Sequence, residues 1–96
     1  MKQVQIDHQT LKVSGKIDYE TAERVYHDGI LALKSVRNWP IVIDLVNAEQ
    51  GNTLLLAIIL QWLKQCPSID SIKIGQMPPK MKGIIEASHL EHLVVA

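Results

Sequence analysis

Residues 41–63 read IVIDLVNAEQGNTLLLAIILQWL, and this segment predicts the centre of the architecture. Its first five residues, 41–45, are apolar except for Asp44. A strand that is apolar on both faces usually lies inside a sheet. Residues 47–52 are polar and predict a loop, and residues 53–65 are long enough and poor enough in turn residues to form a helix. The segment therefore predicts a central strand, a loop and an apolar helix.

The residues before this segment predict a hairpin and an amphipathic helix. Residues 4–6 and 11–13 alternate polar and apolar side chains, which indicates two antiparallel strands. From Asp18 to residue 33, apolar residues recur every three or four positions, as on the buried face of a helix. Asp18 is predicted to be the N-cap of this helix. The helix is expected to end before Pro40, because a residue that precedes proline is pushed out of the helical region.

The residues after the segment predict two more strands and a helix. Residues 72–74 alternate as a short strand, Pro78-Pro79 opens a last helix, and residues 93–95 form a short closing strand. Strands that are separated by helices favour parallel pairing, whereas the leading hairpin is antiparallel. The expected fold class is therefore α/β, with a mixed sheet and helices packed on it, in a single domain over residues 1–96.

Composition and charge exclude several classes of protein. Apolar residues make up 47% of the 96-residue chain and charged residues 21%, which is typical of a globular domain. Ten basic and ten acidic residues give a formal net charge of zero, which argues against nucleic acid as a partner. The apolar run at residues 54–60 is too short to cross a bilayer, and residues 1–10 lack the apolar stretch of a secretory signal. A single cysteine excludes an internal disulfide, so the expected compartment is the cytoplasm.

The sequence offers little support for catalysis, a metal or a cofactor. His89 and His92 are three residues apart, but no third ligand stands at a spacing that would complete a zinc site. Cys66 has no obvious histidine partner and is expected to be a small buried apolar residue. The glycines form no phosphate-binding motif, and no nucleophile-elbow motif is present. We therefore expect a protein that is not an enzyme and holds no metal or cofactor.

The junction between the polar loop and the apolar helix is the strongest candidate for a site. In α/β sheets, sites gather where strands end, and a hydroxyl at a helix N-terminus faces unpaired N–H groups. Asn52 or Thr53 could simply cap the helix. The helix that follows, however, is apolar nearly all round, more than one buried stripe needs. Either this helix is sandwiched within the fold, or part of it meets a partner.

Three stretches of the chain resemble the STAS domain, the fold shared by anti-sigma-factor antagonists, the C-terminal regions of sulfate transporters and the MlaB component of the Mla phospholipid-transport ABC system. Residues 11–19 (LKVSGKIDY) resemble the family's second strand and its turn into the first helix. Residues 41–63 resemble its central strand, switch loop and apolar helix. Residues 81–93 (MKGIIEASHLEHL) resemble its last helix and return.

The resemblance implies a role for the loop-to-helix junction. In the family, a Ser or Thr in this loop is the phosphorylation or partner-contact residue, and Thr53 falls on that position. Asn52 stands where an acidic residue is usual, and Leu54 and Leu55 stand where small residues are common. The expected partner-binding residues are Gln50, Gly51, Asn52, Thr53 and Leu55.

The MlaB-like branch of the family is the first choice, because the chain has stand-alone length and a threonine at this position. This branch implies a non-enzymatic cytoplasmic subunit, held at the inner face of the inner membrane through its complex. Such a subunit binds and stabilises the ATPase subunit of an ABC transporter that moves phospholipid.

Two alternatives stay open. An anti-sigma-factor antagonist would be switched by a kinase partner that phosphorylates Thr53. A small-ligand carrier would hold a lipid or an acyl chain under the apolar helix.

Overall fold

The computed structural model describes residues 3–49 and 53–94 of the chain. In chain order, its elements are β1 (Val4–Asp7), β2 (Thr10–Val13), β3 (Gly15–Lys16), α1 (Ala22–Lys34), β4 (Ile41–Asp44), β5 (Ala48–Glu49), α2 (Thr53–Lys64), β6 (Ile72–Ile74), α3 (Pro79–Ala87) and the 3-10 turn η1 (Glu91–Leu93).

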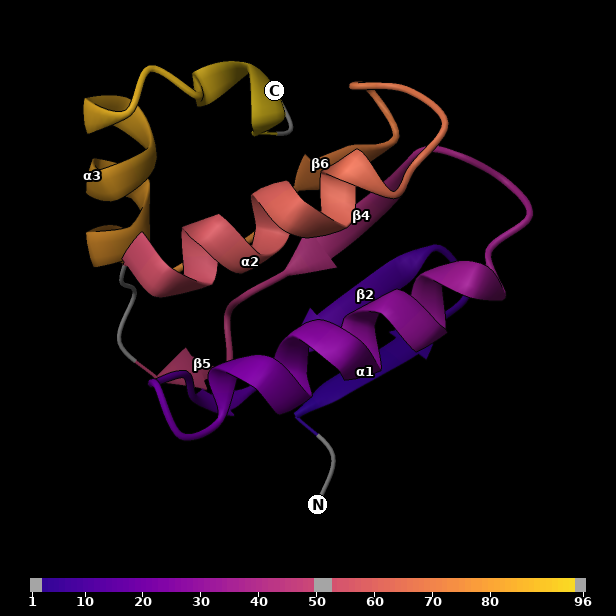
Figure 1. Cartoon of the computed structure of the whole chain (residues 1–96). Helices are drawn as coiled ribbons and strands as arrows, with labels where there is room; N and C mark the ends of the chain where they lie inside the picture. Colours follow the sequence, from indigo (N-terminus) through magenta and orange to yellow (C-terminus); the bar gives the residue numbers. More distant parts are fainter. Residues whose placement is uncertain (1–2, 50–52, 95–96) are drawn as a thin grey trace.

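Four of the strands form a mixed sheet in the order β1-β2-β4-β6 (Figure 1). β1 and β2 form the predicted antiparallel hairpin, and β4 pairs in parallel with β2 on one side and β6 on the other. β4 therefore lies inside the sheet, as its apolar run predicted. The expected fold class, a mixed sheet with helices packed on it, is confirmed.

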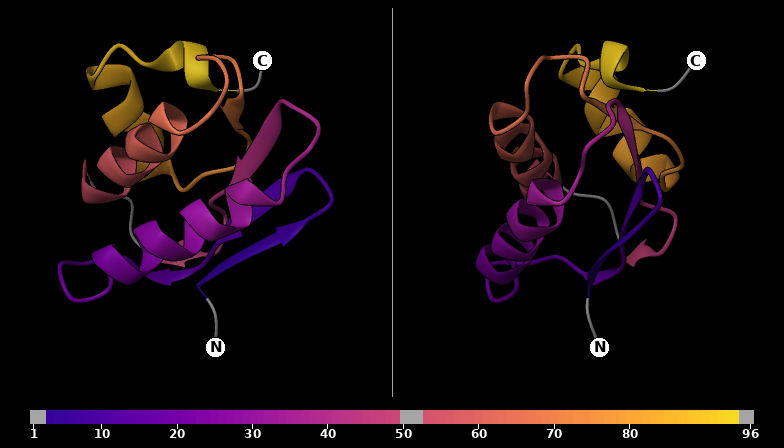
Figure 2. Two further views of the ribbon diagram at one scale, coloured as in Figure 1. Left: turned by 45° about the vertical axis from the view of Figure 1, so that its right-hand side comes forward. Right: turned by 90° about the vertical axis from the view of Figure 1, so that its right-hand side faces the viewer.

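Two of the helices cover one face of this sheet. Figure 2 shows α1 and α2 side by side over that face. The inward side chains of the strands alternate with half-buried or exposed ones, so that Ile41 and Ile43 are fully buried while Val42 and Asp44 are not. The apolar core between the sheet and the α1–α2 layer gives the fold its stability, because burying apolar surface is the main favourable term in folding.

The structure differs from the sequence prediction at the start of α1. The helix begins at Ala22 with Thr21 at the N-cap position, so the prediction that Asp18 is the N-cap was wrong. Residues 18–21 instead form a turn, closed by a 2.8 Å hydrogen bond from Ala22 N to Asp18 O. The Asp18 carboxylate bonds to backbone N–H groups inside this turn, an arrangement that competes with helix formation.

The closing segment differs in part. Of the strand predicted at residues 93–95, Val94 forms a parallel bridge with Ile74, Leu93 belongs instead to η1, and residue 95 lies outside the described residues. The amides of Leu93 and Val94 donate to Leu90 O and Glu91 O at 2.9 and 3.0 Å, which closes the turn before this bridge.

Two smaller differences concern a loop and a cysteine. The segment predicted as a polar loop contains β5, which pairs in parallel with β3. Cys66 is half-buried instead of fully buried, because it lies just beyond the end of α2. Among the helices of residues 3–49 and 53–94, none has the length and apolar content needed to cross a bilayer.

Candidate functional site

The candidate site lies where the chain passes from β4 to α2. The end of β4 is fixed by Asp44, whose carboxylate Oδ1 accepts a 2.9 Å hydrogen bond from the backbone N–H of Val46. Leu45 N donates to Gln76 O at 2.8 Å, and Ala48 N donates to Leu45 O at 3.0 Å. The chain therefore leaves the sheet in a defined turn.

The two-residue strand β5 continues this turn and is held by β3. Gly15 is opposite Ala48 and Lys16 is opposite Glu49, and Gly15 N donates to Asn47 O at 3.1 Å. Gly15 has a φ of 82°, a left-handed conformation that glycine adopts without steric cost. Three of the predicted partner-binding residues, Gln50, Gly51 and Asn52, follow β5 directly and lie outside the described residues.

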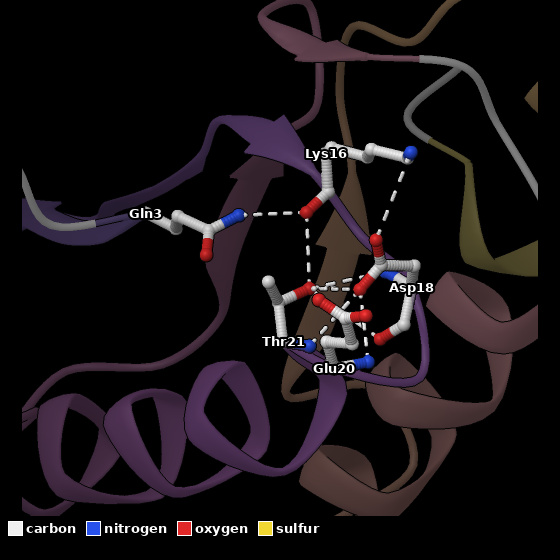
Figure 3. A network of polar contacts seen from close by, with 5 residues as sticks. All are labelled: Gln3, Lys16, Asp18, Glu20 and Thr21. Atoms are coloured by element: carbon white, nitrogen blue, oxygen red, sulfur yellow. Dashed lines mark hydrogen bonds and ion pairs between the residues drawn. The ribbon is translucent and has the colours of Figure 1, made fainter.

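A network of polar contacts holds β3 in place (Figure 3). The side-chain amide Nε2 of Gln3 donates to Lys16 O at 3.0 Å and to Ser14 O at 3.2 Å. The Thr21 hydroxyl donates to the same Lys16 carbonyl at 3.0 Å, and Arg24 Nη2 donates to Gln3 Oε1 at 2.9 Å. Because β3 pairs with β5, this network also fixes the position from which the chain enters residues 50–52.

Asp18 is the charged centre of the network. Its carboxylate Oδ1 accepts hydrogen bonds from the backbone N–H groups of Glu20 at 2.9 Å and Thr21 at 3.1 Å, and its Oδ2 lies 3.9 Å from Lys16 Nζ. The N–H of Thr21 is the main cause that lowers the pKa of Asp18, partly opposed by desolvation and assisted by Glu20 N–H and Lys16. The carboxylate therefore stays charged and keeps the turn closed at neutral pH.

Sequence reasoning missed the network role of Gln3, Asp18 and Thr21. For Asp18 and Thr21 the sequence did contain a signal. An aspartate followed three residues later by a threonine is typical of a turn in which side chains bond to nearby backbone groups. The contribution of Gln3 had no such signal, since it depends on the register of β1 against β2.

Thr53 and Leu55, the other two predicted partner-binding residues, differ in exposure. Thr53 is the first residue of α2 and is exposed. Leu55 has no exposed surface and belongs to the core, so its side chain is not available to another protein. The first turn of α2 contains no acidic side chain. Thr53 therefore stands as an accessible hydroxyl at the positive end of the helix dipole.

The burial of α2 shows how much of its apolar surface is used within the fold. Leu55, Leu56, Ile58, Ile59 and Trp62 are buried, so most of the apolar surface of the helix serves the fold. An exposed stripe remains along Thr53, Ala57 and Gln61, which are four residues apart and therefore lie on one face.

The structure supports neither a nucleophile nor a metal centre among the residues it describes. Burial raises the pKa of the Cys66 thiol, and its Sγ lies 3.3 Å from Trp62 O, an arrangement that favours the unreactive thiol. His89 and His92 are both exposed. No group of three His, Cys, Asp or Glu side chains able to hold a metal ion occurs within residues 3–49 and 53–94.

Comparison with known proteins gives three informative likenesses. The chain is 43% identical to a chain of the Acinetobacter MlaFEDB complex in its ATP-bound Vtrans2 conformation, with a TM-score of 0.83 over 91% of this chain and 94% of that chain. It is 42% identical to a chain of the same complex in the Vtrans1 conformation, with a TM-score of 0.86 over 96% and 97% of the two chains. An anti-sigma factor antagonist from Mycobacterium paratuberculosis matches at 22% identity, with a TM-score of 0.73 over 95% of this chain and 79% of that chain, and supports the fold alone. No protein-family model and no curated protein matches the chain.

Proposed function

The chain belongs to the MlaB-like group of the STAS-domain family, and we propose on this basis that it is a non-enzymatic subunit of an ABC-type phospholipid transport system. Its task in this proposal is to bind and stabilise the ATPase subunit of the transporter. Because that ATPase works on the cytoplasmic side, the subunit would lie at the inner face of the inner membrane through its complex.

The observation that carries the proposal is the match of nearly the whole chain, at 42–43% identity, to chains of a transporter complex whose structure is ATP-bound. A domain that is similar over its full length to a member of an assembly has the size and shape to occupy the same place. The exposed Thr53 gives this domain a polar group at the junction that the sequence analysis singled out.

The proposed contact with the ATPase is centred on Thr53. Its hydroxyl both donates and accepts hydrogen bonds, so it can pair with a backbone or side-chain group of the partner. Contacts at the centre of a patch tend to dominate affinity. Gln50, Gly51 and Asn52 stay in the proposal as neighbours of Thr53 in the chain, whereas the buried Leu55 does not.

Thr53→Glu tests this contact. A carboxylate without a partner inside an interface costs about 3 kcal/mol, so we expect binding to the cognate ATPase to weaken about 100-fold. The measurement is co-purification followed by titration calorimetry, with circular dichroism as a check of the fold. Ala87→Glu adds the same carboxylate to an exposed position of α3 and should bind like the wild type.

The possible results separate two failures. If Thr53→Glu binds as tightly as the wild type, Thr53 is not at the interface. If the wild-type chain does not bind the ATPase at all, the proposed function itself is wrong.

The two alternative functions have less support. Phosphorylation of Thr53 by an anti-sigma factor kinase stays a prediction, because the antagonist structure shares the fold at only 22% identity. A lipid carrier would need space under α2, but the side chains of Leu55, Ile59 and Trp62 fill the underside of this helix and are at most 1% exposed.

A further inference from the structure

A shallow groove with a volume of about 430 Å³ lies between α1 and α2, the two helices that run side by side in Figures 1 and 2. We call it the α1–α2 groove. Its lining is mainly apolar and comes from Ala22 and Tyr26 of α1 and from Leu54, Ala57 and Ile58 of α2. Glu23 and Gln61 complete the lining.

The side chains at the helix contact explain where the groove forms. Farther along the helices, the Trp62 ring packs directly against Gly29, which leaves no free space there. Toward the N-terminal ends, small side chains at Ala22 and Ala57 leave the space between the helices open. An alanine on each helix thus exposes the apolar floor made by Leu54 and Ile58.

The groove is continuous with the proposed contact at Thr53. Ala57 follows Thr53 by one helical turn on the same exposed stripe, and Leu54 is its neighbour in the chain. On the α1 side, Tyr19 stands in the turn three residues before Ala22 and is 92% exposed. Tyrosines of this kind are enriched among the residues that dominate protein interfaces.

The charge of the groove indicates what could bind there. Glu23 is the charged residue of its lining, and no lysine or arginine is among the lining residues. Arg24, the cation next in the chain, donates to Gln3, and neither residue lines the groove. The basic side chain that does lie close to Glu23 is His27. Its Nε2 is 3.6 Å from Glu23 Oε1, and the imidazole carries a charge only when it is protonated. A partner with a basic residue beside an apolar one would complement this surface.

We propose that the α1–α2 groove, together with Tyr19, receives a segment of the transporter ATPase that inserts an apolar side chain between the helices and places a lysine or arginine next to Glu23. This inference rests on the proposed function, because it names the partner of that function as the occupant. It extends the interface from the start of α2 across to α1.

The first experiment fills the groove with charge. Ala57→Glu places a carboxylate between Leu54 and Ile58, and we expect the Kd for the cognate ATPase to rise about 100-fold, comparable to burying an unpaired charge. The matched control is Ala87→Glu, an exposed alanine on α3 outside the groove, with an expected change of less than twofold. Circular dichroism confirms that both variants fold.

The second experiment leaves the helices untouched. Tyr19→Ala removes an exposed aromatic from a turn, and we expect a rise in Kd of about tenfold. Ile69→Ala is its control, since Ile69 is also an exposed apolar residue in a turn, at 71%. Glu23→Lys should in addition slow association about fivefold at low salt and reduce its dependence on salt, because like charges would then meet.

The outcomes distinguish this inference from the function on which it rests. Weakened binding by the groove variants, with normal binding by the controls, supports the groove. If the wild type binds the ATPase and Thr53→Glu weakens binding, but Ala57→Glu, Tyr19→Ala and Glu23→Lys bind like the wild type, the groove is refuted while the proposed function stands. If the wild type does not bind, the proposed function is wrong and the inference is lost with it.

Discussion

A single carboxylate, that of Asp18, controls how the chain enters α1. It accepts hydrogen bonds from two backbone N–H groups and lies near Lys16. One side chain therefore joins the turn, the strand β3 and the start of the helix. Sequence reasoning singled out Asp18 but assigned it the N-cap position, which Thr21 occupies. The two arrangements share the same chemistry, because in a turn that precedes a helix and in a helix cap alike, backbone N–H groups donate to the aspartate carboxylate.

The lowered pKa of Asp18 makes part of the stability depend on pH. A carboxylate whose pKa is lower in the folded state stabilises the protein above the ordinary aspartate pKa of about 4, and this contribution is lost as the pH falls through the folded-state value. We therefore expect Asp18→Asn to unfold at lower urea concentration than the wild type at pH 7. The difference should shrink below about pH 4, where the carboxylate of the unfolded chain becomes protonated, and vanish once the pH falls below the lower pKa of the folded state.

Urea unfolding curves between pH 7 and pH 2 measure this effect. Glu86→Gln, which removes a carboxylate from an exposed position of α3, serves as the control and should leave the pH profile unchanged. A constant difference between Asp18→Asn and the wild type over this pH range would show that the charge of Asp18 contributes nothing.

At the scale of the elements, the contact between α1 and α2 is the tightest constraint. A Cβ atom at Gly29 would clash with ring atoms of Trp62, and the Trp62 indole N–H donates to Tyr26 O at 2.9 Å. The helical pattern placed Gly29 on the buried face of its helix, and the structure confirms this. The pattern could not say why the residue is glycine, because that depends on a tryptophan 33 positions later in the chain.

Gly29→Ala tests this packing. Alanine favours helix by about 1 kcal/mol over glycine, but overpacking against a buried ring costs about 1–3 kcal/mol or more. Because the clash involves several ring atoms, we expect the variant to lose about 2 kcal/mol of unfolding free energy. Gly83→Ala in α3 is the matched control: nothing lies within 4 Å of its would-be Cβ, so it should gain up to about 1 kcal/mol.

Thermal and urea unfolding of the two variants give the comparison. Equal stability of Gly29→Ala and the wild type would mean that separating α1 and α2 costs no more than the about 1 kcal/mol that alanine gains in a helix. The α1–α2 groove would then also change shape readily.

Elements of different length were predicted with different success. β4, α2, β6 and α3 follow from apolar runs and periodicity, and the structure confirms each of them. The two-residue strands β3 and β5 were missed, because a pair of residues has no alternation to recognise. In the region of the site, the sequence placed Thr53 at the start of the helix, as the structure does. It did not reveal that Leu55 is buried.

For the molecule as a whole, apolar packing outweighs charge. Ser71 is the buried polar residue among the described ones, and the core otherwise consists of apolar side chains. Each of the four ion pairs found in residues 3–49 and 53–94 includes at least one well-exposed side chain. Exposed ion pairs contribute little to stability and are screened by salt.

We therefore expect the thermal midpoint to be nearly independent of ionic strength. Raising sodium chloride from about 0.05 to about 0.5 M should move the midpoint by less than about 3 °C, since screening removes only small contributions. Circular dichroism melts measure this directly. A fall of about 10 °C would show that charge contributes far more than the exposed pairs account for.

The topology was predictable because each connection obeys a general rule. A short link between β1 and β2 requires antiparallel pairing, and the helical connections around β4 favour parallel pairing, so the mixed sheet followed from the order of elements. The closing segment was predicted only in part. Val94 bridges in parallel to Ile74, but the turn that places Leu93 in η1 has no periodicity to reveal it.

The parallel pairing of β2 with β4 has a consequence for the folding of the chain while it is synthesised on the ribosome. Thr10 of β2 is opposite Val42 of β4. The edge of β2 that faces away from β1 therefore has no partner strand until about thirty further residues have been synthesised. Contacts between residues so far apart in sequence form late and slowly. Leu11 and Val13, which are buried in the folded protein, therefore stay exposed in the nascent hairpin until the rest of the core is made.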